Sequence, residues 1–210
     1  MKIAILGGTG SLGKGLASRL IKAGHDVLIG SRDLPKAQEI AVQLGLESSS
    51  GMLNIDAAKI CELACLTVPF AHQESTLISI DDGLQNKIMI YATVPLMPPK
   101  VMRVQLPEIG SAALNAQSIL GEKTTVVSAF QNISAELLQT DAEIDFYVLV
   151  AGDFLDARNT VIELAADAGL TGWHAGPLCN SVAAEALTSI LIAINKKHSL
   201  AHSGIKITGH

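Results

Sequence analysis

A glycine-rich loop near the start of the chain constrains the fold more than any other feature of the sequence. The apolar run 3–6 leads directly into GGTGSLG at 7–13, where Gly8, Gly10 and Gly13 fit the pattern G-x-G-x-x-G. Leucines at helical spacing follow, so the loop joins a strand to an amphipathic helix. Glycines in this setting let the backbone turn sharply and approach a pyrophosphate, which the helix N-terminus also attracts. The sequence therefore predicts a βα unit that binds a dinucleotide.

The end of the next expected strand, 26–29, indicates which dinucleotide binds. An enzyme that uses NAD places Asp or Glu there for the ribose 2′-hydroxyl, whereas a cation receives the 2′-phosphate of NADP. This chain has Ser31 and Arg32, with Lys36 one helical turn further on. Cations beside a helix N-terminus are unfavourable unless an anion accompanies them. The residues thus favour NADP over NAD, with Asp33 as a competing local partner for the two cations.

Alternating strand and helix patterns continue beyond this point. We expect helices at 35–44, 55–62, 72–79, 111–120, 154–168 and 182–196, and strands near Met52 and at 63–68, 87–91, 124–128 and 146–150. This order predicts an α/β protein with a Rossmann-type doubly wound parallel sheet and a small C-terminal α/β domain. We place the NADP-binding domain at 1–142 and at 143–210 the domain that closes the cleft over the second substrate and forms a dimer.

Two strands end at prolines. Thr67-Val68-Pro69 follows the strand at 63–68, and Val94-Pro95 opens a proline-rich loop that carries Lys100 and Arg103. Ligands bind at the carboxyl ends of parallel strands, so Val68 and its backbone neighbours can face a nicotinamide ring. A proline that merely ends a strand explains the same residues equally well.

Composition excludes several classes of protein. Of the 210 residues, 49% are hydrophobic and 17% are charged, and the net charge is −5 without a basic stripe, which argues against a nucleic-acid partner. The apolar stretch 182–194 is interrupted by Glu185, Thr188 and Ser189, and we expect it to be too short for a membrane span. We expect a helix buried by its own domain and by a second subunit, in a homodimer.

The cysteines and histidines indicate neither a disulfide framework nor a metal site. Cys61, Cys65 and Cys179 lack metal-ligand spacing, and the six histidines are scattered along the chain. We expect reduced, buried thiols and a cytoplasmic protein. A strand that begins at Lys2 leaves no room for a signal peptide.

Taken together, these motifs resemble the coenzyme F420-dependent NADP oxidoreductases. The resemblance covers essentially the whole chain, and its most distinctive blocks are the glycine loop through Ala17 and Gly30-Ser31-Arg32 with Lys36. Weaker blocks follow in order: Gly51-Met52, Asp56-Ala57-Ala58, Leu66-Thr67-Val68-Pro69, Val94-Pro95, Val126-Val127-Ser128-Ala129, Gly176-Pro177-Leu178 and Asn180-Ser181.

The resemblance implies a site residue by residue. Gly8, Thr9, Gly10, Ser11, Leu12 and Gly13 would bind the nucleotide, with Thr9, Ser31, Arg32 and Lys36 holding its 2′-phosphate and Thr67, Val68 and Pro69 lining the nicotinamide. Val94, Pro95, Gln131 and Ile133 would face the deazaflavin ring of F420. This chain has Gln131 where family members carry His and Ser134 where they carry Pro.

The reaction implied is hydride transfer between NADP(H) and coenzyme F420, in which the cofactors carry the chemistry. The two carbons would stack roughly 3–3.5 Å apart, and no catalytic acid or base is then required. His72 and His174 could serve as acids, but we expect ordinary histidines there. Lys100, Arg103 and the cations at 196–198 could meet the anionic tail of F420 or be simply solvated.

Two alternatives remain open from the sequence. One is an NADPH-dependent flavin or ferric-flavin reductase that uses FMN or FAD, because the cytosolic domain of six-transmembrane ferric reductases is similar in its glycine loop and Ser-Arg pair. Gln131 in place of His favours that interpretation. The other is a non-catalytic NADPH-binding sensor, which would need only the first site.

Overall fold

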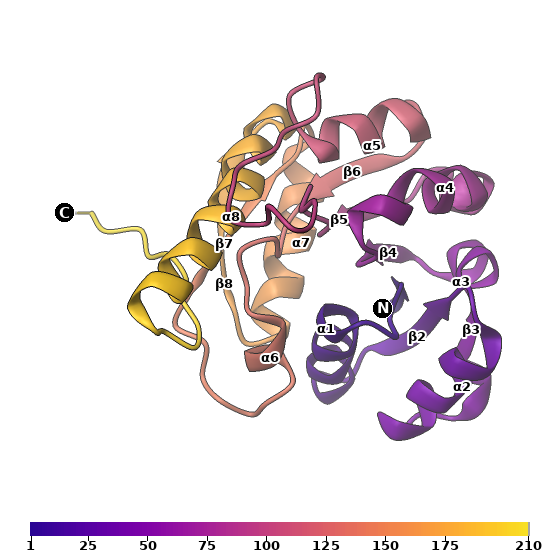
Figure 1. Ribbon diagram of the computed structural model, residues 1–210. Coiled ribbons are helices and arrows are strands. Elements are labelled where there is room, and N and C mark those ends of the chain that lie inside the picture. Colours follow the sequence, from indigo (N-terminus) through magenta and orange to yellow (C-terminus); the bar gives the residue numbers. More distant parts are fainter. Residues whose placement is uncertain (210) are drawn as a thin grey trace.

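Eight strands and the helices between them are drawn in Figure 1, from a computed structural model that describes residues 1–209. The strands are β1 (Lys2–Leu6), β2 (Asp26–Ser31), β3 (Gly51–Leu53), β4 (Leu63–Leu66), β5 (Ile88–Tyr91), β6 (Thr125–Ser128), β7 (Tyr147–Ala151) and β8 (Thr171–Gly176). The helices are α1 (Ser11–Lys22), α2 (Leu34–Gln43), α3 (Asn54–Ile60), α4 (Phe70–Ile80), α5 (Ala112–Leu120), α6 (Ala135–Leu138), α7 (Leu155–Asp167) and α8 (Ser181–His198).

All eight strands form one sheet in the order β3-β2-β1-β4-β5-β6-β7-β8. The pairs from β3 to β6 are parallel, β6 and β7 are antiparallel, and β7 and β8 are parallel again. The first three strands are added in order toward one edge of the sheet, which β3 forms. After β3 the chain crosses back to β4, which pairs with the other side of β1. This arrangement confirms the predicted α/β class and the doubly wound sheet.

Helices cover both faces of the sheet, and the strand sequences explain why. Alternate residues of β1 point to opposite faces: Ile3 and Ile5 join a core with α1, α2, α6 and α7, whereas Ala4 and Leu6 join a core with α3, α4 and α5. Strands buried on both sides read as continuous apolar runs, as 3–6 does.

The sheet runs without interruption past residue 142. β6 from the first part of the chain pairs with β7 from the second, at Ser128 and Ala151. Residues 143–209 therefore extend the sheet by two strands and add α7 and α8. Beyond α8 the chain returns to β7, where Tyr147 N–H donates to the Ile205 carbonyl at 2.9 Å.

Most predicted elements are confirmed within a few residues, but four features differ. The strand β8 (Thr171–Gly176) was not predicted. The strand expected at 63–68 ends at Leu66, since the following residues turn into α4. The four-residue helix α6 was not predicted, because one turn has no periodicity to detect. Cys179 is exposed rather than buried, while Cys61 and Cys65 lie in the core.

The C-terminal helix is longer than the sequence pattern suggests. The helical segment Leu178–His198 has 21 residues and a mean hydropathy of 1.4 over its most apolar part, so by length and composition alone it could cross a membrane. The stretch 182–194 is only part of this helix, so its shortness does not by itself exclude a span. Its Glu185 is buried and accepts hydrogen bonds from α5, which ties the helix to the rest of the fold.

Candidate dinucleotide-binding cleft

The glycine loop leaves β1 through a tight turn that only glycine accommodates. Gly7 has φ +81°, and a Cβ there would lie 2.7 Å from a methyl carbon of Val68. Its N–H donates to the Gly30 carbonyl and to Asn54 Oδ1, both at 3.1 Å. The loop is thus fastened to the end of β2 and the start of α3 before it reaches α1.

Glycine is required at the three motif positions for different physical reasons. A Cβ at Gly13 would lie 2.7 Å from the Gly8 Cα and 2.8 Å from Thr67 Oγ1, and one at Gly8 would lie 2.8 Å from the Ile5 carbonyl oxygen. Those two glycines therefore let α1 pack closely on the strands. A Cβ at Gly10 meets nothing of the protein nearer than 3.4 Å. Gly10 instead keeps the loop surface open for a ligand.

Two helix N-termini point into the same space. No side chain within residues 1–209 caps α1 at Gly10 or α4 at Pro69. The first N–H groups of such helices lack intrahelical partners and carry partial positive charge. Gly10, Ser11 and Leu12 present this end of α1 to the cleft. The arrangement suits a phosphate group.

The residues that follow β2 place two cations beside this helix end. Asp33 does not compete for them: its Oδ1 accepts the Lys36 N–H at 3.1 Å and so caps α2. The Asp33 N–H in turn reaches Ser31 Oγ at 3.1 Å. In the described part of the chain, the charged groups of Arg32 and Lys36 form no ion pair, and both residues are exposed.

The segment after β4 forms the opposite wall. Thr67 donates both its backbone N–H and its hydroxyl to the Leu6 carbonyl, at 2.9 and 3.1 Å. Val68 is nearly buried, and its carbonyl accepts the Thr93 hydroxyl at 2.8 Å. Pro69 then starts α4. These bonds fix the ends of β4 and β5 against one another.

These elements enclose a cleft of about 1140 Å³ along the carboxyl ends of the strands. It brings together many of the predicted residues: Thr9, Gly10, Ser11, Leu12, Ser31, Arg32, Lys36, Thr67, Val68, Pro69 and Val94. Gly8, Gly13 and Pro95 are buried beneath it and do not line it.

The sequence did not indicate several lining residues. Asn54 both faces the cleft and holds Gly7, and α4 contributes Phe70 and Ser75. The available signal was positional, because each group begins a helix that follows a strand at the carboxyl edge of the sheet. His72 therefore lies at the cleft, whereas His174 lies beside Arg158, whose Nε approaches its Nδ1 at 3.4 Å.

Gln131 and Ile133 line a second, smaller hollow of about 260 Å³ between α6, α8 and the tail after α8. It adjoins the cleft: Gln131 Nε2 donates to the Tyr91 carbonyl at 2.7 Å, and Ala92, the next residue, lines the cleft. The predicted site residues thus fall into two neighbouring hollows rather than one. Within residues 1–209 no group of His, Cys, Asp and Glu has the arrangement of a metal site.

The fold and the cleft define a dinucleotide-binding protein of the doubly wound α/β class. The model of the family "NADP oxidoreductase coenzyme F420-dependent" matches residues 2–95. The F420-dependent NADP reductase of Methanothermobacter thermautotrophicus is 41% identical over 222 residues, covering 99% of this chain and 95% of that protein. The chain belongs to the F420-dependent NADP reductase family.

Two further similarities extend this result. The metalloreductase STEAP3 of Rattus norvegicus is 30% identical over 97% of this chain, which spans 40% of that protein. A solved structure from Arthrobacter sp. FB24, described as a proposed F420-dependent NADP-reductase, matches with a TM-score of 0.86 and 23% identity, covering 100% of both chains. At that identity, the structural match supports the fold.

Proposed function

We propose that this protein is an oxidoreductase that transfers a hydride between NADP(H) and coenzyme F420. One observation carries the proposal. Arg32 and Lys36, without ion-pair partners in the described chain, line the same cleft as an uncapped helix N-terminus behind a glycine loop. A nucleotide with one more phosphate than NAD fits this charge pattern. Relatives named F420-dependent NADP reductase support the second substrate.

The nucleotide fits the cleft from one end to the other. Gly10, Ser11 and Leu12 would offer N–H groups to the pyrophosphate, with Gly8 and Gly13 keeping α1 close beneath it. Thr9, Ser31, Arg32 and Lys36 would hold the 2′-phosphate, with Arg32 contributing a planar pair of donors. Thr67, Val68 and Pro69 would place the nicotinamide near the end of β5.

The second substrate would lie beside Val94, Pro95, Gln131 and Ile133. Val94 lines the cleft, with Pro95 buried next to it, and Gln131 and Ile133 line the smaller hollow, so a ring stacked against the nicotinamide would reach from the cleft toward α8. A deazaflavin, when bound, supplies a carbon that accepts or releases a hydride. The side chains orient the reactants and exclude water, and we assign no side chain a catalytic proton transfer.

An acceptor assay tests this function. The purified protein is mixed with NADPH and oxidised F420, FMN or FAD in separate reactions, and the loss of NADPH absorbance is followed. We expect turnover with F420 to exceed turnover with either flavin. Faster reaction with FMN or FAD would establish a flavin reductase, and NADPH binding without turnover on any acceptor would establish a sensor.

The assembly follows from the exposed face of α8. Ile190 and Ile194 on that helix are 46% and 37% exposed, although they are large apolar side chains. We infer a homodimer in which a second copy covers this face. Residues 1–142 would then bind the nucleotide, and residues 143–210 would close the second hollow and form the interface. The net charge and the three free cysteines support a cytoplasmic enzyme without nucleic-acid or membrane partners.

A further inference from the structure

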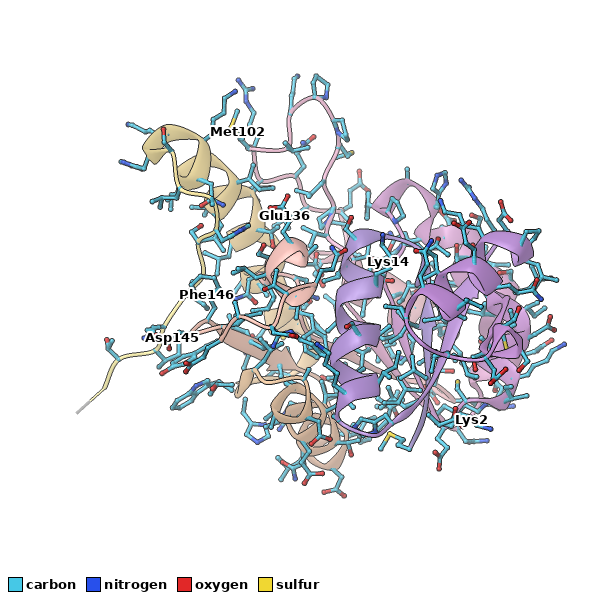
Figure 2. All side chains as sticks on the ribbon, turned by 90° about the horizontal axis from the view of Figure 1, so that it is seen from below. Lys2, Lys14, Met102, Glu136, Asp145 and Phe146 are labelled. Atoms are coloured by element: carbon cyan, nitrogen blue, oxygen red, sulfur yellow. The ribbon has the colours of Figure 1, made fainter. Side chains whose placement is uncertain are left out.

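Some polar side-chain atoms that line the smaller hollow have no hydrogen-bond partner within residues 1–209. It lies between the segment 131–136 after β6, one face of α8 and the tail residues 201–203. In Figure 2, Glu136 lies on α6, and Phe146 lies beside the tail that follows α8. A Cβ added at Gly204 would lie 2.1 Å from Cγ of Phe146, so the tail packs directly on that ring. The hollow is therefore closed by three separate parts of the chain.

Three amide oxygens in this lining have no hydrogen-bond partner. They are Gln131 Oε1, Asn132 Oδ1 and Asn195 Oδ1, and within residues 1–209 they are the only buried side-chain nitrogen or oxygen atoms without one. Gln131 and Asn132 are 5% and 4% exposed. A buried acceptor without a donor costs about 1–3 kcal/mol, so three in one small hollow require an explanation.

The orientation of two of these amides is fixed by carbonyl groups. Gln131 Nε2 donates to the Tyr91 carbonyl and to Ser128 Oγ, both at 2.7 Å. Asn132 Nδ2 donates to the Tyr147 carbonyl at 2.7 Å. Because a carbonyl oxygen can only accept, the nitrogens must face the backbone and the oxygens must remain free. Rotating either amide would bring two oxygens together.

The remaining lining determines what kind of group can enter. No lysine or arginine lines the hollow in the described chain, and Glu136 does line it. His202 Nδ1 lies 2.9 Å from Ser134 Oγ, and its Nε2 lies 3.8 Å from Glu136. An anion would meet oxygen acceptors and a carboxylate, which disfavours it. Leu191 and Ile192 supply apolar walls for carbon atoms.

We propose that this hollow binds an uncharged, hydrogen-bond-donating part of the second redox substrate, with Gln131, Asn132 and Asn195 as the acceptors. The inference rests on the proposed function, because the hollow adjoins the cleft at Tyr91 and Ala92. The donors can be hydroxyl groups of a polyol side chain or the ring N–H of a deazaflavin. The anionic end of such a substrate extends away from the hollow.

Asn195 provides the sharpest test, because its Oδ1 has no hydrogen-bond partner within residues 1–209. The dissociation constant of F420 is measured by fluorescence, without turnover, for wild type, Asn195→Leu and Asn195→Asp. We expect Asn195→Leu to bind F420 about fivefold to tenfold more weakly, as for one lost hydrogen bond. Asn195→Asp retains an oxygen acceptor and should bind within about threefold of wild type. The affinity for NADPH should not change in either variant.

Matched controls separate binding from folding. Asn159→Leu replaces an exposed residue of α7 and should alter neither affinity. Removing an unsatisfied buried amide should leave the midpoint of thermal unfolding of Asn195→Leu equal to or above that of wild type. A merely structural role for Asn195 would instead lower that midpoint and weaken F420 and NADPH binding together, which would overturn the proposal.

Substrate analogues identify the donor. A deazaflavin that carries a methyl group in place of the polyol chain removes the hydroxyls, and N3-methylation removes the ring donor. The analogue without the relevant donor should bind wild type and Asn195→Leu equally. If wild type binds F420 and Asn195→Leu binds it equally, this inference fails alone. If wild type binds no deazaflavin, the proposed function and this inference both fail.

Discussion

At the residue scale, we propose that Arg32 sets the choice between NADP and NAD. It stands directly after β2, and the carboxylate of the neighbouring Asp33 accepts the backbone N–H of Lys36. Within residues 1–209 Arg32 forms no ion pair. The guanidinium is therefore available to a ligand. A bidentate contact between arginine and phosphate is charge-assisted and geometrically specific, whereas a ribose hydroxyl offers no comparable partner. The preference for NADP over NAD should reside chiefly in this side chain.

Replacing Arg32 with alanine should therefore weaken NADPH binding selectively. The expected loss is about 1.5–3 kcal/mol, the range for a hydrogen bond to a charged group, with little change for NADH. Isothermal titration with both nucleotides measures the difference. Lys123→Ala is the control and should leave both affinities unchanged, because this exposed cation precedes β6 and lies at the amino ends of the parallel strands, away from the cleft. Equal losses for NADPH and NADH would contradict the assignment of the 2′-phosphate.

Gly10 and Gly13 should respond differently to the same added methyl group. Gly10→Ala meets no protein atom within 3.4 Å and has φ −80°, so its unfolding free energy should fall by no more than about 1 kcal/mol. Its NADPH affinity should fall by at least about tenfold, because the methyl group occupies the ligand's approach. Gly13→Ala should mainly lose folding stability, since its Cβ would lie 2.7 Å from Gly8 Cα. Thermal unfolding and nucleotide titration of both variants check this, and unimpaired NADPH binding by Gly10→Ala would refute it.

At the scale of elements, α5 and α8 are joined by a buried polar contact. The carboxylate of Glu185 accepts the N–H groups of Ala112 and Ala113 at 2.7 and 3.0 Å. Ser181 donates to Ser111, which caps α5, at 2.7 Å. Burial raises the pKa of Glu185 to about 7, although the backbone N–H donors oppose this shift. The contact holds the end of the proline-rich loop that covers the cleft.

This raised pKa makes stability depend on pH in a definite direction. The unfolded chain ionises Glu185 near its ordinary pKa of 4.5, and the folded protein does so near 7, so folding binds a proton between these values. The stabilisation from Glu185 is complete below pH 4.5 and is lost as pH rises to about 7. The difference between the two pKa values corresponds to roughly 3 kcal/mol.

The variant Glu185→Gln cannot titrate and should lack this dependence. Urea unfolding at a series of pH values should show wild type losing stability relative to Glu185→Gln as pH rises from 4.5 to about 7. Glu163→Gln, at an exposed position on α7, should follow the wild-type profile. Parallel profiles for wild type and Glu185→Gln would show that Glu185 does not titrate in this range.

Some elements could be predicted from sequence because their signals are local. The glycine loop, the pair Ser31-Arg32 and the apolar strands each depend on neighbours within a few residues. The βα units, and the side of the cleft that carries Arg32 and Lys36, could therefore be predicted. The second hollow could not be found in this way, because Gln131 and Asn195 come to line one hollow only after α8 packs against α5 and β7. The role of Asp33 as a helix cap, rather than a partner of Arg32, also required the coordinates.

At the scale of the whole molecule, one continuous sheet carries both hollows. The cleft follows the carboxyl ends of the parallel strands, and the smaller hollow is lined by the segment that follows β6, whose neighbour β7 runs antiparallel to it. Residues before and after 142 therefore contribute to one continuous sheet rather than to sheets that are separate. Two reactants held on such a sheet need little further ordering to meet.

The exposed face of α8 leads to a prediction about assembly. We expect light scattering to report twice the mass of one chain for wild type, and Ile190→Asp to shift the protein toward the monomer by placing a charge in the apolar interface. Ile78→Asp, at a 63% exposed position on α4, is the control and should leave the mass unchanged. A monomeric wild-type protein would refute the dimer.

The most direct test of the central claim follows the hydride itself. NADPH carrying deuterium at the transferring position of C4 is incubated with the protein and oxidised F420 in ordinary water, and the reduced deazaflavin is analysed by mass spectrometry. Direct transfer between two carbons predicts one deuterium retained in the product, because the new carbon–hydrogen bond does not exchange with solvent. Reduced F420 without deuterium, or no reduced F420 at all, would contradict the account.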